Sequence, residues 1–230
     1  FISRNPVRTG YSAIADEWIP IKPSTDGALL LALINEIIKQ GLYDREFLVK
    51  YSNAAELVNM DENSTEHGMF VRFEVPKEEG CFDAQNKLWW DRHLNGPISM
   101  HTEGTDPYLL GEFQLDDGTP VKPAFQLLVE RVRDYTAEWA ADITGIPVET
   151  IKRLANEMGI TARDEKIELP IAWTDTWGNE HDHLTGNPVA FHAMRGLAAH
   201  SNGFQTIRAM SILMSIIGTI DRPGGFRHKA

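Results

Sequence analysis

Cysteine and positive charge are both scarce in this sequence. It has one cysteine, Cys81, which cannot form a disulfide within the chain, a cysteine-rich zinc site or an iron–sulfur cluster. Its 22 lysines and arginines are outnumbered by 33 aspartates and glutamates, so the formal net charge is −11. General nucleic-acid-binding proteins carry a basic stripe, and anionic lipid also attracts basic residues. The composition therefore argues against nucleic acid and anionic membrane surfaces as partners.

Long hydrophobic runs and the usual nucleotide-binding motifs are also missing. The longest apolar runs, 28–34 and 212–217, are too short to span a bilayer. Neither the GxGxxG fingerprint nor the P-loop motif occurs, which disfavours an ordinary dinucleotide or P-loop site. The sequence starts at Phe1 in an apparent strand, without a signal peptide, which favours a piece of a longer polypeptide.

The sequence does contain alternating runs of extended and helical spacing. Extended runs predict strands at 1–3, 17–21, 167–173 and 189–194. Helical spacing predicts helices at 26–40, 44–51, 125–133, 136–145, 148–158 and 203–217. Strands that alternate with helices indicate an α/β fold with a mostly parallel sheet. Between 53 and 122 the periodicity fades, and we interpret this region as a long irregular insertion with a few short strands.

Cap residues set the expected ends of two of these helices. Thr136 is a suitable N-cap for the 136–145 helix, which we expect to end at Gly145. The following helix has a proline in its first turn, and we expect Gly159 to stop it.

The loop at 22–26 joins a short predicted strand to a wholly apolar helix. Ser24 and Thr25 offer hydroxyls there, and Asp26 offers a carboxylate at the start of the helix. In open α/β sheets, nucleotides bind at the carboxyl ends of strands. Two roles are therefore open to Asp26: it caps the helix, or its oxygens accept two parallel N–H bonds from a guanine edge. The loop taken alone favours the cap.

Two further predicted junctions carry polar side chains. At the first, Asn5 suits a ribose hydroxyl and Arg4 or Arg8 a phosphate, although a turn with solvated arginines is an equal alternative. At 194–203, Gly196 permits close backbone approach. The polar residues of this junction are Arg195, His200, Ser201 and Asn202. Three polar junctions in one chain indicate a ligand more strongly than any one of them.

The histidines indicate a functional site less strongly than the polar junctions do. In the Glu-His-Asp-His segment at 180–183, the histidines are two positions apart and match no familiar zinc spacing, so a solvated turn is favoured over a metal site. His192 follows Phe191 in a predicted strand, and we expect it in the core. No Ser-His-Asp or Cys-His arrangement for nucleophilic catalysis can be singled out.

Several segments carry a likeness to a known family. They are 5–9, 14–16, 21–29 (IKPSTDGAL), 41–47, 135–145, 151–155, 195–203 and 217–225. In this order they resemble the third domain of the large subunit of molybdopterin oxidoreductases, the dimethyl sulfoxide reductase family, which binds bis(molybdopterin guanine dinucleotide). The runs 191–204 and 224–227 are most similar to the sulfur-compound branch, which includes sulfite dehydrogenases and polysulfide or thiosulfate reductases.

The resemblance implies one Rossmann-like, three-layer α/β domain over residues 1–230, part of a larger subunit. In such a domain Asp26 would hold the guanine of one pterin cofactor, and the junction at Asn5 would meet its ribose or phosphate. Family members usually have glycine at the position of Ser24 and aspartate at that of Asn5. The cofactor-binding residues that the resemblance implies are Asn5, Pro6, Arg8, Lys22, Ser24, Asp26, Arg195, Gly196, His200 and Asn202.

The same resemblance implies molybdenum or tungsten on the cofactor and a 4Fe–4S cluster held by a part of the large subunit that precedes this chain. The whole protein would carry out two-electron redox of a small sulfur oxyanion or sulfur compound, and this chain alone would be inactive. The implied partners are the other domains of the large subunit, an iron–sulfur electron-transfer subunit, plus a membrane anchor subunit. The compartment stays open between the cytoplasm, the membrane through partner subunits, and the periplasm.

Two rival interpretations remain. A nucleotide-dependent transferase on a similar sheet would need a phosphate loop or a metal-binding carboxylate pair, and the sequence shows neither. A non-catalytic interaction module would use the insertion at 53–122 as its contact surface.

Overall fold

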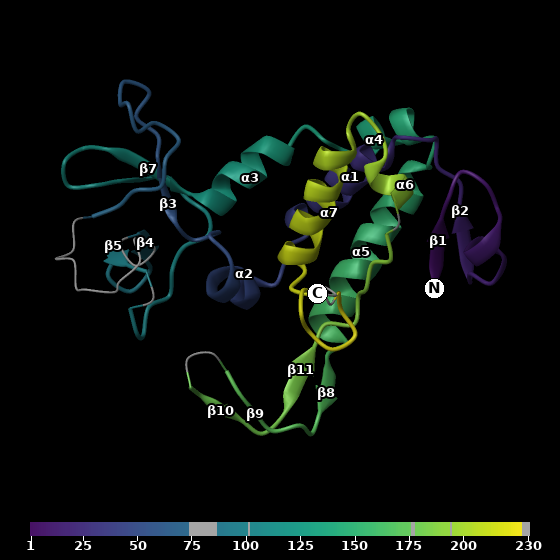
Figure 1. Cartoon of the computed structure of the whole chain (residues 1–230). Helices are drawn as coiled ribbons and strands as arrows, with labels where there is room; N and C mark the ends of the chain where they lie inside the picture. The colour runs from purple at the N-terminus through teal and green to yellow at the C-terminus, as the bar shows by residue number, and fades with distance from the viewer. Residues whose placement is uncertain (74–86, 101, 176–177, 194, 227–230) are drawn as a thin grey trace. The chain divides into compact units, whose positions relative to one another are not determined.

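The computed structural model describes residues 1–73, 87–100, 102–175, 178–193 and 195–226 (Figure 1). Cys81 lies outside these ranges. The chain divides into two compact units: unit 1 comprises Phe1–Asp44 and Val132–Ala230, and unit 2 comprises Arg45–Arg131. The expected insertion at 53–122 falls inside unit 2. That the whole chain acts as one cofactor-binding domain stays a prediction.

Unit 1 is a bundle of helices around α1 (Asp26–Lys39). This helix packs against α4 (Ala137–Thr144), α5 (Val148–Asp164) and α7 (Gly203–Ile216) (Figure 1). Its fully buried aliphatic side chains are Leu29, Leu30, Leu33, Ile34 and Ile37. Burying such a side chain stabilises by about 1.5–3 kcal/mol. The apolar circumference of α1 therefore makes it the centre of this unit.

The predicted caps of α4 are confirmed, whereas the predicted stop of α5 is wrong. The Trp139 amide donates to Thr136 Oγ1 at 3.1 Å, and Gly145 closes α4 in the left-handed conformation with φ 78°. The helix α5 continues past Gly159. A Cβ on Gly159 would lie 2.6 Å from Cβ of Leu42. This glycine therefore permits close packing inside the helix instead of ending it.

A short helix, α6 (Arg195–Ala198), packs against the start of α7. A Cβ on Gly203 would fall 1.9 Å from the Ala198 carbonyl oxygen, so the turn between the two helices requires glycine there. In the part of the chain that the structure describes, no helix is long and apolar enough to cross a bilayer.

Unit 1 has one parallel strand pair in its described part. The strands β1 (Ile2–Arg4) and β2 (Glu17–Ile19) lie side by side, with Ser3 opposite Trp18. The 3₁₀ helix η1 (Gly10–Ala13) lies between them in the chain. The described residues thus form a mixed α/β fold of helices and small sheets, in which the mostly parallel sheet that the sequence predicts is not shown.

The segment after α5 accounts for this difference. The strand β8 (Ile167–Leu169) pairs antiparallel with β11 (Leu184–Gly186), and β9 (Trp173–Thr174) pairs antiparallel with β10 (Glu180–His181). The chain turns back on itself here, whereas a parallel pair needs a crossover connection of about a dozen residues or more. The predicted strand at 167–173 is therefore two short strands of an antiparallel ribbon.

Unit 2 is built on short antiparallel strands. Its described elements are α2 (Arg45–Tyr51), β3 (Leu57–Asn59), β4 (Leu88–Asp91), β5 (Gly96–Ser99), β6 (Phe113–Gln114), β7 (Pro120–Pro123) and α3 (Ala124–Val132), which ends at the unit boundary. One sheet has the order β3-β7-β6, and β4 pairs with β5. Leu57, Trp90 and Val121 form a core, in which Trp90 stacks on Phe113 with ring centroids 4.6 Å apart. Unit 2 thus has a hydrophobic core of its own.

Candidate functional site

The loop at 22–26 is a tight turn that is tied to the end of α4. The Lys22 amide donates to the Thr144 carbonyl at 3.0 Å. Thr25 donates back to the Lys22 carbonyl through its amide at 3.3 Å and through its hydroxyl at 2.7 Å. The Lys22 ammonium donates to the Asp142 carbonyl at 3.4 Å, near the C-terminus of α4, where a cation is favoured. These bonds fix the point at which α1 begins.

Asp26 is the first residue of α1, and Thr25 is the N-cap residue, so Asp26 does not fill the capping role. Its Oδ1 lies 3.4 Å from Nε of Arg4 at the end of β1, and these side chains are 19% and 24% exposed. Nε of Arg4 is buried and makes no hydrogen bond within the described residues. Burial lowers the pKa of Arg4, and the Asp26 carboxylate opposes that shift. The strand end and the helix start therefore share a charged pair that is only partly satisfied.

Ser24 joins this loop to the turn between α6 and α7. Its backbone lies in the left-handed region, with φ 65°. Its Oγ is 3.0 Å from Nδ1 of His200, and its carbonyl accepts a hydrogen bond from Nδ2 of Asn202 at 3.1 Å. Three of the predicted site residues are thus brought together. Glycine adopts this φ without strain, which agrees with the glycine that the family resemblance implies at this position.

The N-termini of α1 and α7 approach each other closely. A Cβ on Gly27 in the first turn of α1 would lie 3.0 Å from Oγ1 of Thr206. The Thr206 hydroxyl donates to the Asn202 carbonyl at 3.1 Å, so it stays within the first turn of α7. Helix N-termini carry partial positive charge and unpaired N–H groups. Two of them in one place favour an anionic ligand.

Residues 2–230 match the family model of molybdopterin oxidoreductases. The chain belongs to the molybdopterin oxidoreductase family. It is 70% identical over 230 residues to a sulfite dehydrogenase subunit from Allochromatium vinosum, covering 100% of this chain and 24% of that protein. It is 29% identical over 210 residues to the probable dimethyl sulfoxide reductase chain YnfF of Escherichia coli, covering 91% and 17%. The expected family is confirmed, and this chain spans less than a quarter of the length of either relative.

A solved structure has a similar fold. Acetylene hydratase from Pelobacter acetylenicus superposes with a TM-score of 0.50 at 21% identity, covering 97% of this chain and 18% of that one. At this identity the likeness concerns the fold alone, and it supports the mixed α/β fold of this molybdopterin oxidoreductase chain.

The predicted site residues that follow β1 make local contacts in this family member. The Trp18 indole donates to the Asn5 carbonyl at 2.9 Å. The Arg8 guanidinium lies 6.0 Å from the centroid of the Trp18 ring. Asn5, Pro6 and Arg8 are exposed. Arg8 is therefore an exposed arginine in a turn, as the alternative interpretation expects. Arg4 instead contacts the loop at 22–26 through Asp26.

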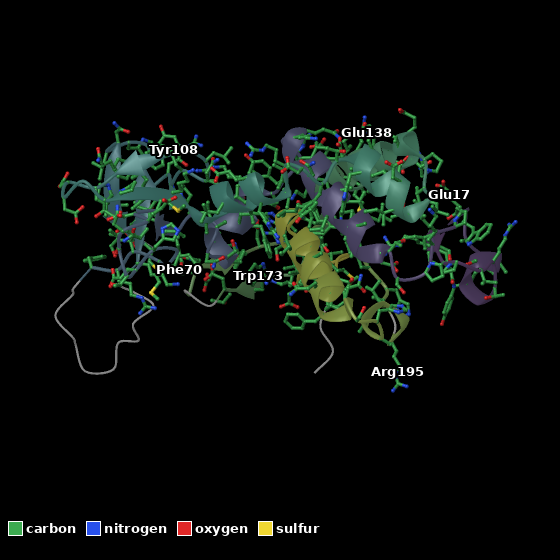
Figure 2. The ribbon with its side chains drawn as sticks, turned by 90° about the horizontal axis from the view of Figure 1, so that it is seen from above. Glu17, Phe70, Tyr108, Glu138, Trp173 and Arg195 are labelled. Carbon is green, nitrogen blue, oxygen red and sulfur yellow. The ribbon has the colours of Figure 1, made fainter. Side chains whose placement is uncertain are left out.

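The predicted residues on α6 lie on the surface. Arg195 is exposed and points away from the ribbon (Figure 2). A Cβ on Gly196 would meet nothing within 4 Å, so no close backbone approach within the described chain requires this glycine. Neither residue contacts the Ser24–Asp26 segment through any interaction in the described residues.

The histidines of the β9–β10 ribbon have local partners. Nε2 of His181 lies 3.2 Å from Oδ2 of Asp175, and its ring stacks on Trp173 at 4.5 Å. Asp182 hydrogen-bonds to His183 and raises the pKa of that histidine. Among the described residues, no group of three or more histidine, cysteine, aspartate or glutamate side chains is arranged to hold a metal ion.

The prediction that His192 lies in the core is wrong. Its side chain is exposed, and its ring centroid lies 6.0 Å from that of Tyr11. The strand expected at 189–194 does not form in its described residues. The Val189 carbonyl instead accepts a hydrogen bond from the Thr219 hydroxyl at 2.7 Å, so this backbone is bound to the segment that follows α7.

Sequence reasoning missed two contacts of the site. The sequence left Arg4 open between a phosphate ligand and a solvated turn residue, whereas the structure pairs Arg4 with Asp26. Opposite charges at the end of the first predicted strand and after the end of the second were an available signal, because the carboxyl ends of adjacent parallel strands lie side by side. The approach of Thr206 to Gly27 had no such signal, since Thr206 lies within a predicted helix.

Proposed function

We propose that unit 1 binds the guanosine end of a molybdopterin guanine dinucleotide, with Asp26 as the acceptor for the N–H groups of guanine. The observation that supports this most strongly is the Asp26 carboxylate itself. It is partly buried at the first residue of α1, in a chain that matches the molybdopterin oxidoreductase family over residues 2–230. Such a carboxylate suits two parallel N–H donors.

The residues around Asp26 fit this ligand. A carboxylate has about four lone-pair sites, and the single contact with Arg4 leaves most of them available. The buried Nε of Arg4 makes no hydrogen bond within the described chain, so an acceptor atom of a nucleotide would satisfy it. The adjacent N-termini of α1 and α7 favour the negative charge of its phosphates.

We extend the proposal to the other residues that the family resemblance implies. The exposed side chains of Arg8 and Arg195 suit phosphate oxygens, and Lys22 adds positive charge beside the loop. The further proposed contacts are Asn5, Pro6, Ser24, Gly196, His200 and Asn202. When bound, the molybdenum or tungsten cofactor would supply two-electron, oxygen-atom-transfer chemistry. This chain's own residues would bind and orient its guanosine end.

We propose that the whole protein acts on a small sulfur oxyanion or sulfur compound. The support is the 70% identity to a protein that is named for sulfite. Oxidation of sulfite to sulfate adds one oxygen from water and releases two electrons and two protons, so the enzyme needs an electron acceptor. We therefore propose that a 4Fe–4S cluster elsewhere in the polypeptide and an iron–sulfur electron-transfer subunit carry these electrons. We also propose a membrane anchor subunit, which the family resemblance implies.

We also propose that β1 and β2 belong to a larger, Rossmann-like parallel sheet completed by the rest of the polypeptide. Two strands alone are marginally stable, and three or more with a covered face are the usual minimum. Phe1 and Ile2 are 61% and 41% exposed, which leaves apolar surface for further packing.

The test replaces Asp26 in the full-length polypeptide that contains this chain. Guanosine nucleotide and molybdenum are measured per polypeptide after acid release. We expect Asp26→Ala to weaken cofactor retention about tenfold or more, because hydrogen bonds to a charged acceptor contribute about 1.5–3 kcal/mol. Asp134→Ala is the matched control, since that carboxylate is 89% exposed and far along the sequence. Unchanged nucleotide content in the Asp26→Ala protein would contradict the proposal.

A further inference from the structure

The strained residue of the site is Ser24. Three non-glycine residues in the described chain have positive φ: Ser24 at 65°, Asn95 at 48° and Asp221 at 56°. Asparagine and aspartate are enriched in the left-handed region, whereas serine is not among the residues that enter it readily. The turn from Lys22 to Thr25 places Ser24 at a position of positive φ, and contacts from outside the loop would offset the cost of serine in this conformation.

The turn between α6 and α7 supplies two contacts to this one residue. His200 bonds to the side chain of Ser24 at 3.0 Å, and Asn202 bonds to its main-chain carbonyl at 3.1 Å. They lie 176 and 178 residues further along the chain, so neither contact results from local turn chemistry. Both the hydroxyl and the peptide group of Ser24 are thereby held.

The use of Asn202 supports a dedicated role for this turn. Asn202 is the N-cap residue of α7, yet its side chain makes no capping hydrogen bond. Asparagine is among the best N-cap residues, and its amide oxygen usually accepts from the helix. Here the side-chain hydrogen bond of Asn202 is the one that its amide nitrogen donates to the Ser24 carbonyl.

We infer that His200 and Asn202 are positioning residues that hold Ser24 in the left-handed conformation and thereby direct the Asp26 carboxylate. Asp26 follows Ser24 by two positions, and Thr25 between them is bound back to the Lys22 carbonyl. A change of backbone direction at Ser24 would therefore rotate the start of α1. This inference rests on the proposed guanine contact of Asp26, and it adds to the proposed cofactor contacts of His200 and Asn202 a role through Ser24.

The test uses a double-mutant cycle in the full-length polypeptide. The four proteins are the wild type, His200→Ala, Ser24→Gly and the combination of both. Glycine adopts positive φ freely and lacks the hydroxyl, so the contact of His200 has no function in the Ser24→Gly background. His200→Asn is the conservative variant, because an amide near the position of Nδ1 can still bond to the serine hydroxyl.

The first readout is hydrogen exchange at the amides of residues 22–28 in the cofactor-free protein. We expect His200→Ala to speed exchange at the Thr25 amide about fivefold, as loss of one neutral hydrogen bond would. We expect His200→Asn to restore most of the protection and His200→Ala to have no further effect after Ser24→Gly. Unchanged exchange in His200→Ala, or an equal effect in both backgrounds, would overturn the inference.

The second readout is guanosine nucleotide content per polypeptide in the loaded protein. We expect it to fall in His200→Ala and to recover in the double variant, because glycine needs no external support. Faster exchange in His200→Ala with full nucleotide content would overturn the positioning role. Asp26→Ala, measured in parallel, separates the two claims: if its nucleotide content is full, the guanine contact fails, while the exchange cycle still judges the support of Ser24.

Discussion

Unit 1 is held together by aliphatic side chains on long helices, whereas unit 2 relies on an aromatic cluster and buried charge. In unit 1, α1 is surrounded by three helices, and its leucines have no exposed surface at positions 29, 30 and 33. In unit 2, Trp90 stacks on Phe113, and the Lys87 ammonium lies 2.6 Å from the Glu56 carboxylate, with side chains 18% and 6% exposed. The candidate site belongs to unit 1, where α1 is packed against three helices, which suits a ligand that must be oriented.

Turns in unit 2 depend on side chains that replace backbone partners. The Asp91 carboxylate accepts hydrogen bonds from the amides of His93, Leu94 and Asp106 at 2.8, 2.9 and 2.8 Å. These bonds lower the pKa of Asp91, the one from the Leu94 amide most of all. A single buried carboxylate thus organises a loop in a unit that has few long helices.

The largest expected effect tests the aliphatic framework of unit 1. We expect Leu33→Ala to lower the local free energy of unfolding by about 3 kcal/mol, because a fully buried leucine leaves a cavity. Hydrogen exchange of the α1 amides in the full-length polypeptide measures this loss. Leu31→Ala is the matched control in the same helix, since Leu31 is only partly buried. Equal losses in the two variants would show that burial does not set the stability of α1.

The second prediction tests the buried charge of unit 2. We expect Glu56→Gln to destabilise the β3-β7-β6 sheet by about 2 kcal/mol, because it leaves the Lys87 ammonium without its counter-charge in a largely buried place. The value lies below that of a fully buried pair, since Lys87 retains some access to water. Amide exchange in β7 reports the effect, with the exposed Glu66→Gln as control. Equal protection in both proteins would mean that this pair contributes nothing to the sheet.

The difference between the two units also explains which elements of the fold could be predicted from the sequence. Helices α1, α4 and α7 follow from apolar spacing, and the ends of α4 follow also from its cap residues, because these signals act within about one turn. The sheets depend on pairing between strands of two to four residues, which local spacing does not encode. Gly159 shows the same limit within a helix: its role depends on Leu42, which comes from a distant segment.

The candidate site also combines residues that the sequence indicates with contacts that only the structure reveals. Asp26 and Ser24 could be singled out because a strand-to-helix loop is a local pattern. The pairing of Arg4 with Asp26 and the support of Ser24 by His200 are long-range contacts, so their geometry required the structure. Arg195 and Gly196 have no interaction with the Ser24–Asp26 segment in the described chain, so their expected roles stay predictions.

The smallest expected effect concerns an exposed ion pair of unit 1, the counterpart of the buried pair of unit 2. The Glu138 carboxylate lies at the surface and accepts a hydrogen bond from the Lys152 ammonium at 2.8 Å (Figure 2). This bond, more than those from its own amide and from Thr136, lowers the pKa of Glu138 from 4.5 to about 2. A lowered carboxyl pKa stabilises the fold fully above pH 4.5, and the stabilisation is lost as the pH falls towards 2.

We expect Lys152→Ala to raise the pKa of Glu138, measured by carboxyl NMR titration, towards but not to 4.5, because the Thr136 contact remains. Lys39→Ala should leave it unchanged, since Lys39 pairs with Glu36. A pKa that stays near 2 in the Lys152→Ala protein would show that the backbone and Thr136 dominate instead. The exposure of the pair predicts little change in unfolding free energy, in contrast to Glu56→Gln.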